Sequence, residues 1–287
     1  MQNLRYLLPL LLVLLFACEN KPAASTDAEP ASGEKVTSPT GGKTINLQPK
    51  TLALGNEPNP HAEGFNLNGS DNMAIQLADS IVKYHGGRKA WDEVQYLSWN
   101  FFGARTLLWD KHNSRVRIDV PQENAVYLLD YSGEEIAGRV RKLGNEITDP
   151  AALAADLKKA NSMFINDAFW LVHQFKLKDT GVTLRYAGEA RTDPQAQRPS
   201  HIIDQTFDGV GDTPDNRYRL YVDKVTYRIN TWQFFRDADD TEPAMETPWN
   251  AYRPYGNILL SGDRGGRFQL SDISVRKVVD KTQFTEF

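Results

Sequence analysis

Five histidines are the first residues to examine for metal or acid–base chemistry. They are His61, His85, His112, His173 and His201, expected in a linker, at a helix end, in a turn, in a buried helix and at a strand start. A zinc site needs at least three converging nitrogen, sulfur or oxygen ligands, and no two of these histidines have metal-ligand spacing. The sequence therefore predicts no metal site, and helix capping or surface placement accounts for single histidines.

Acidic side chains gather between residues 237 and 246, and oxygen-rich loops of this kind can bind calcium. The acidic residues are Asp237, Asp239, Asp240, Glu242 and Glu246. The run lacks the glycine at the sharp turn and the terminal glutamate of an EF-hand loop. We interpret it as a solvated acidic loop.

Nucleophile and carboxylate patterns give no clear active site. There is no G-x-S-x-G motif, and Ser200 and His201 are chain neighbours, which seldom face each other as nucleophile and base. Asp110 and Asp119 lie on opposite strands of an expected hairpin, as a glycosidase pair could. A simpler interpretation is that both carboxylates form cross-strand ion pairs with arginines at positions 105, 115 and 117. The sequence favours a non-catalytic protein without a cofactor over an enzyme of unrecognised type.

The first 18 residues predict an export signal. Arg5 precedes an apolar run from Tyr6 to Phe16, which is about half the ~20 residues of a membrane-spanning helix. The run ends in Leu15-Phe16-Ala17-Cys18, which resembles the lipobox of bacterial lipoproteins. That resemblance implies lipidation of Cys18, the only cysteine, and a membrane anchor of several acyl chains. Glu19, not an aspartate, directly follows Cys18, which favours the outer membrane under the export rule of some bacteria and leaves the membrane face open.

Composition divides the rest of the chain into two parts. Residues 19–70 are rich in Pro, Ala, Ser, Thr, Gly and Asn, which predicts a flexible tether. Residues 71–287 are expected to form a single folded domain. Over the whole chain, 40% hydrophobic and 24% charged residues are typical of a globular protein. The net charge of −4 gives no bulk attraction to nucleic acid.

Helix signals occur at three places in the expected domain. A helix after Ser70 or Asp71 has apolar residues at helical spacing and stops at Gly86-Gly87. A second helix is predicted to begin at Pro150, capped by Asp149. A third, buried helix is predicted to begin after a cap at Asn166 or Asp167.

Alternating apolar and polar residues predict strands through most of the remaining domain. The ranges are 94–103, 105–110, 115–120, 125–130, 136–142, 182–187, 201–208, 216–223, 225–235, 257–261 and 267–277. Strands that directly follow strands indicate an antiparallel sheet, and about ten twisted strands must curl. We therefore expect an α+β fold, in which a curved antiparallel sheet, a half-open β-barrel of about ten strands, wraps over a few helices.

This organisation resembles the LolA/LolB-like lipoprotein carriers. The local match is the run from Tyr218 to Ile229, with a strand, an Asp-Lys-x-Thr turn and a returning strand. The resemblance implies an unclosed barrel, lined by apolar side chains and lidded by helices, which holds acyl chains. Most of residues 71–287 also resemble an uncharacterised lipoprotein family of Bacteroidota, which implies no activity. The motifs are His85-Gly86-Gly87, Trp109-Asp110, Asn166-Asp167-Ala168-Phe169-Trp170-Leu171, Phe175-Lys176-Leu177-Lys178-Asp179 and Pro248-Trp249.

Large aromatic residues are the remaining functional signal. Trp99, Phe101 and Trp109 are candidates for the wall of a ligand cavity, although filling a plain core would use the same residue types. The first hypothesis is a lipid-anchored envelope protein that binds an acyl chain, a lipid or another hydrophobic ligand. The alternative is a protein-interaction or envelope-assembly module with a filled core and an envelope protein partner. A cavity of about 300 Å³ or more would favour the ligand. The sequence leaves the ligand, the partner and the oligomeric state open.

Overall fold

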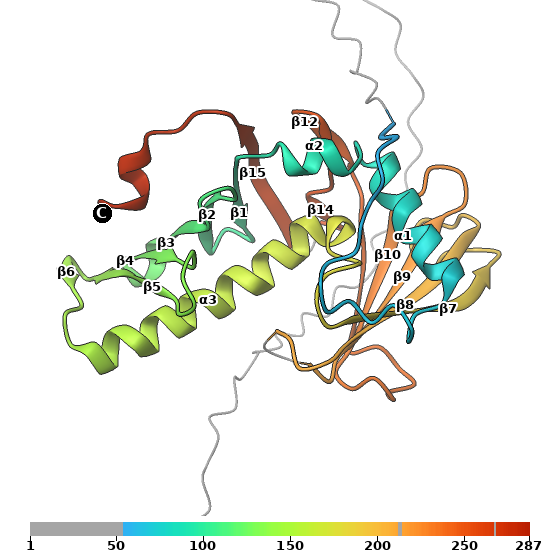
Figure 1. Ribbon diagram of the computed structural model, residues 1–287, viewed down its shortest axis with the longest axis horizontal. Coiled ribbons are helices and arrows are strands. Elements are labelled where there is room, and N and C mark those ends of the chain that lie inside the picture. Colours follow the sequence, from blue (N-terminus) through green and yellow to red (C-terminus); the bar gives the residue numbers. More distant parts are fainter. Residues whose placement is uncertain (1–53, 212–213, 267) are drawn as a thin grey trace, which may run out of the picture. The chain divides into compact units, whose positions relative to one another are not determined.

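The computed structural model describes residues 54–211, 214–266 and 268–287 (Figure 1). All the described residues belong to one compact unit. The expected signal peptide, Cys18 and most of the expected tether lie outside the described residues. Among the helices in the described ranges, none is long and apolar enough to cross a membrane.

Three α-helices and three short 3-10 helices occur in the described ranges. They are α1 (Asn72–Tyr84), α2 (Arg88–Asp92), α3 (Pro150–Val172), η1 (Pro121–Glu123), η2 (His173–Phe175) and η3 (Lys281–Phe284). α1 begins after Asp71 and buries the apolar face that the sequence predicts. At its end Gly86 has φ +111°, and a Cβ there would lie 2.2 Å from the Asn257 carbonyl oxygen. Glycine is therefore required where the chain turns away from α1.

The two helices expected after Asp149 are a single helix of 23 residues, so the prediction of a break at Asn166-Asp167 is wrong. α3 begins as predicted, since the Asp149 carboxylate accepts a hydrogen bond of 2.9 Å from the Ala152 amide. Asp167 does not cap a helix. Its side chain instead binds Arg105, which lies 62 residues earlier in the chain. Because Arg105 supplies the hydrogen bonds to this carboxylate, Asp167 caps no helix and α3 continues past it.

The strands form antiparallel sheets. In chain order they are β1 (Tyr96–Phe101), β2 (Arg105–Asp110), β3 (Arg115–Val120), β4 (Ala125–Asp130), β5 (Ala137–Lys142), β6 (Asn145–Glu146), β7 (Val182–Ala190), β8 (Ser200–Phe207), β9 (Arg217–Asp223), β10 (Ile229–Phe235), β11 (Met245–Pro248), β12 (Arg253–Tyr255), β13 (Ile258–Leu260), β14 (Asp263–Arg264) and β15 (Phe268–Arg276). The larger sheet has the order β14-β15-β1-β2-β3-β4-β5-β6. The second has the order β11-β10-β9-β8-β7, and β12 pairs with β13. The expected α+β fold with a curved, open antiparallel sheet is confirmed (Figure 1).

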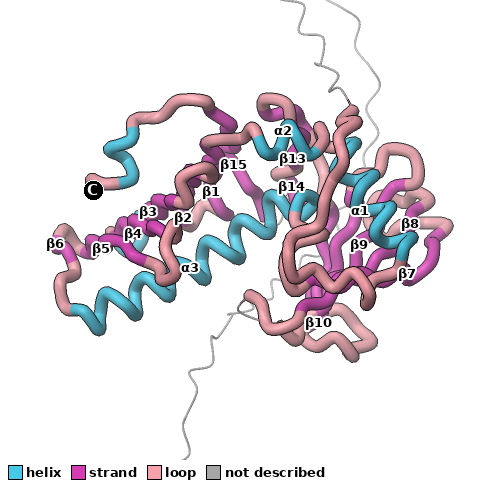
Figure 2. Tube along the Cα trace, viewed as in Figure 1, coloured by secondary structure: helices cyan, strands magenta, loops and turns pink. Residues whose placement is uncertain are grey.

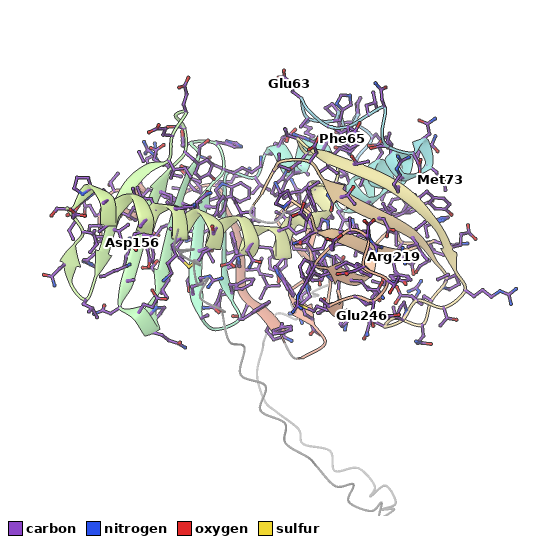
Figure 3. All side chains as sticks on the ribbon, turned by 90° about the horizontal axis from the view of Figure 1, so that it is seen from below. Glu63, Phe65, Met73, Asp156, Arg219 and Glu246 are labelled. Carbon is purple, nitrogen blue, oxygen red and sulfur yellow. The ribbon has the colours of Figure 1, made fainter. Side chains whose placement is uncertain are left out.

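α3 runs along one face of the larger sheet and covers it (Figure 2). Apolar side chains line up across the strands, as in the pairs Leu107 with Ile118 and Trp109 with Val116. Gly138 of β5 leaves no room for a side chain, since a Cβ there would lie 2.0 Å from the Leu128 carbonyl oxygen of β4 and 2.9 Å from a methyl group of Leu157 on α3. Asp156, labelled on α3 in Figure 3, forms an ion pair with Lys142 of β5.

Residues 55–71, the N-terminal strap, are bound to the domain. The Gly55 amide donates to the Lys83 carbonyl at 3.1 Å, and the Asn66 amide donates to the Val182 carbonyl at 3.0 Å. Phe65, labelled in Figure 3, is buried. The folded unit therefore begins upstream of residue 70, where composition places the end of the tether. Proline and glycine prevent long helices and strands in such a segment, but they do not prevent docking.

Candidate functional site

A cavity of about 470 Å³ lies between the second half of α3 and the inner face of the five-stranded sheet. Its lining residues come from α3, the turn between η2 and β7, and strands β7, β8 and β9 with the segment after β8. They are Ile165, Asn166, Phe169, Trp170, Lys176, Asp179, Thr180, Val182, Phe207, Val210, Gly211 and Tyr218. The volume lies in the range of about 300–1,000 Å³ that is typical of small-ligand sites.

The deep wall of the cavity is apolar and largely aromatic. Strand register places Val182 opposite Phe207, on the same face as Tyr218 of β9. The Tyr218 ring lies 5.0 Å from the Phe169 ring and 5.7 Å from the Phe207 ring, centroid to centroid. Trp170, which is buried, completes this wall. The wall offers hydrocarbon and ring surface rather than hydrogen-bonding groups.

Tyr218 is the polar exception in the wall. Its hydroxyl contacts the Asn216 side chain, and burial raises the pKa of Tyr218 to about 12. The phenol is therefore protonated at neutral pH. It can act as a hydrogen-bond donor but not as a base.

The mouth of the cavity is polar. Lys176 and Asp179 form an ion pair there, and their side chains are 37% and 42% exposed. The Thr180 hydroxyl donates a hydrogen bond of 2.7 Å to the Glu63 carbonyl of the N-terminal strap. Ile165 adds an apolar side chain that is 37% exposed. An apolar interior with a polar opening suits a molecule with one apolar end and one polar end.

A buried pair of polar residues packs against Phe169 of the cavity wall. His173 donates from Nε2 to Oε1 of Gln205 at 2.6 Å, and its ring lies 4.1 Å from the Phe169 ring. Burial lowers the pKa of His173 to about 3, so the imidazole is neutral over the physiological range. We interpret this pair as a structural contact that orients Phe169.

Trp99, Phe101 and Trp109 are not among the residues that line this cavity. In the register of β1 with β2, Leu97 lies opposite Trp109 and Trp99 lies opposite Leu107. Trp99 and Phe101 are buried in the hydrophobic core of the domain, and the partly buried Trp109 packs against that core. Residues of α3 and the second sheet line the cavity instead. The sequence marks Phe169 and Trp170 as a dense apolar segment, but it does not show that one side of it borders a cavity.

The carboxylates of the first hairpin have ordinary partners. Asp119 pairs at 2.8 Å with Arg117 of its own strand, not with a cross-strand partner as expected, and Asp110 accepts hydrogen bonds from Asn113. The other two expected arginines bind elsewhere, Arg105 to Asp167 and Arg115 to Asp130. Within the described part of the chain, no group of three or more His, Cys, Asp or Glu side chains is placed to hold a metal ion.

Comparison with known proteins finds matches among solved structures. No protein-family model and no curated protein matches the chain. A solved DUF1329 family protein from Desulfovibrio piger is similar at 14% identity and a TM-score of 0.40, covering 74% of this chain and 96% of that chain. A domain from Vibrio parahaemolyticus, described as an outer membrane lipoprotein-sorting protein domain, is similar at 10% identity and a TM-score of 0.38, with 74% and 96% covered.

Both likenesses concern the arrangement of the backbone, and neither assigns a ligand to this chain. The resemblance to Bacteroidota lipoproteins stays a prediction.

Proposed function

We propose that this protein is a lipid-anchored component of the bacterial cell envelope that binds an acyl chain or another hydrophobic ligand without covalent chemistry. The observation that carries the proposal is the cavity of about 470 Å³ with its wall of aromatic and aliphatic side chains. A ligand that packs against such a wall removes its hydrocarbon surface from water, which contributes about 25 cal/mol of binding free energy for each Å² buried. A cavity of this size favours ligand binding over the alternative of an interaction module with a filled core.

The anchor is proposed from the sequence alone. Replacement of Cys18 by alanine is expected to move the protein from the membrane fraction to the soluble fraction. The domain should still fold, because the anchor and the core are separate stretches of the chain. Cell fractionation and circular dichroism of the variant check the two halves of this expectation. Retention of the variant in the membrane fraction would contradict lipidation at Cys18.

Replacement of Ile165 by tryptophan is expected to weaken ligand binding about tenfold, which corresponds to about 1.4 kcal/mol. Ile165 lines the mouth, so a larger side chain there takes space from the ligand. The measurement is displacement of a fluorescent fatty acid from the soluble Cys18→Ala chain, together with native mass spectrometry for retained lipid.

The matched control for this test is replacement of Met73 by tryptophan. Met73 lies on α1 (Figure 3) and is 38% exposed, against 37% for Ile165, but it does not line the cavity. The control should bind like the parent chain. Equal affinities of the two variants would place the ligand outside this cavity, and a parent chain that binds neither fatty acid nor any other amphiphile would overturn the proposed function.

A further inference from the structure

The charged side chains at the mouth of the cavity form one balanced pair. Lys176 and Asp179 are the charged residues among those that line the cavity, and they lie three positions apart in the turn between η2 and β7. Both are more than one-third exposed, so water screens their attraction and the pair is held weakly. A ligand can therefore open this pair if it replaces both halves.

The position of the pair fixes which end of a ligand meets it. Trp170 and Val182 are buried in the deep wall, whereas Lys176 and Asp179 are partly exposed at the mouth. A molecule with one apolar chain gains most by placing that chain against the deep wall. Its head group then lies beside the lysine and the aspartate.

The charge of the head group decides how well it suits this mouth. A purely anionic head that binds Lys176 competes with Asp179 and leaves a carboxylate without its partner. A purely cationic head that binds Asp179 does the same to Lys176. A dipolar head replaces both halves, because its phosphate accepts from the lysine ammonium while its own ammonium donates to the aspartate carboxylate.

We infer that the ligand of this cavity is a single-chain amphiphile with a dipolar head group, of the lysophosphatidylethanolamine type. This inference rests on the proposed function, and it names the ligand class of the same cavity. A volume of about 470 Å³ lies toward the small end of the usual range for one small ligand, which suits one chain rather than several.

The test compares amphiphiles that share one chain length and differ in the head. The soluble Cys18→Ala chain is loaded with an uncharged fluorescent probe, N-phenyl-1-naphthylamine. The probe is displaced by lauroyl lysophosphatidylethanolamine, dodecanoate, dodecylammonium or monolauroyl glycerol, each below its micelle-forming concentration. The dipolar amphiphile is expected to bind about twofold to fivefold more tightly than either singly charged one, the effect of one exposed ion pair.

Two variants of the mouth should change the order of affinities in opposite directions. Lys176→Gln leaves a lone carboxylate and should favour dodecylammonium, while Asp179→Asn leaves a lone ammonium and should favour dodecanoate. Lys159→Gln and Glu123→Gln are the matched controls, since that ion pair is exposed to 47% and 46% and does not line the cavity. Neither control should change the order.

The outcomes separate the head-group inference from the proposed function. If all four amphiphiles displace the probe equally, or if dodecanoate binds most tightly to the parent chain, the dipolar ligand is overturned while hydrophobic binding stands. An unchanged order in Lys176→Gln and Asp179→Asn would also overturn it. If no amphiphile displaces the probe, the proposed function fails and the inference fails with it.

Discussion

Replacement of Trp170 by alanine is expected to lower the free energy of unfolding by about 3–5 kcal/mol, the usual cost of truncating a buried aromatic side chain. The indole is buried near the end of α3 and contacts rings from both sheets. Its centroid lies 4.8 Å from Trp232 of the five-stranded sheet and 5.9 Å from Phe268 of the larger sheet. Alanine would leave a void at this junction, and the two sheets would lose a shared contact.

Denaturant and thermal unfolding of the soluble Cys18→Ala chain, both followed by circular dichroism, check this loss. Ile165→Ala serves as the control, since Ile165 lies on the same helix but is partly exposed, and it should cost much less. A drop in melting temperature of only a few degrees for Trp170→Ala would contradict the structural role. Trp170 would then be assigned to the ligand contact alone.

Replacement of Arg105 by methionine is expected to destabilise the protein by about 3 kcal/mol at neutral pH, because removing one partner leaves a buried charge uncompensated. The Arg105 guanidinium binds both carboxylate oxygens of Asp167, at 2.5 and 2.7 Å. Asp167 is fully buried, and its remaining side-chain partner is the Asn166 amide at 3.0 Å. We expect the lower end of the usual range, since Arg105 is itself partly exposed.

The cost of this change should depend on pH. Burial raises the pKa of Asp167 above its usual 3.8, despite the opposing effect of Arg105. A carboxyl with a higher pKa in the folded state binds its proton more tightly when folded, so stability falls as pH rises through that interval. Without Arg105 the pKa rises further, and the destabilisation should shrink as pH falls from about 7 to about 4.

Unfolding measured across this pH range checks the expectation. Adding Asp167→Asn to Arg105→Met removes the buried charge and should recover part of the lost stability at neutral pH. A loss that stays constant with pH would contradict the idea that Arg105 neutralises Asp167.

The first three hairpin strands were predictable because their pattern is local. The ranges 105–110, 115–120 and 125–130 match β2, β3 and β4 residue for residue, since turns bound all three and β3 also alternates strictly between buried and half-buried residues. The shorter strands β6 (Asn145–Glu146) and β14 (Asp263–Arg264) were not predictable, because two residues cannot show an alternation. Each is defined only by its pairing with the neighbouring strand, β6 with β5 and β14 with β15.

The residues that line the cavity were also beyond prediction from local sequence pattern. Phe169 and Tyr218 each carry the expected apolar character, but 49 positions separate them in the sequence, and register together with the path of α3 brings their rings to 5.0 Å. Trp99, Phe101 and Trp109, which were chosen from the sequence, lie instead in the core between the larger sheet and α3. Residue type predicts burial, whereas the border between a filled core and a cavity depends on how closely two elements approach.

The N-terminal strap also occupies an edge at which two molecules could otherwise join. β7 is the last strand of its sheet, and the Leu184 carbonyl accepts from the Asp71 amide at 2.9 Å, while the Tyr186 amide donates to the Asp71 carboxylate at 2.9 Å. An exposed row of such groups is a template for strand-to-strand aggregation. Because the strap pairs with part of this row, it shields the edge of the sheet from strand pairing with a second molecule.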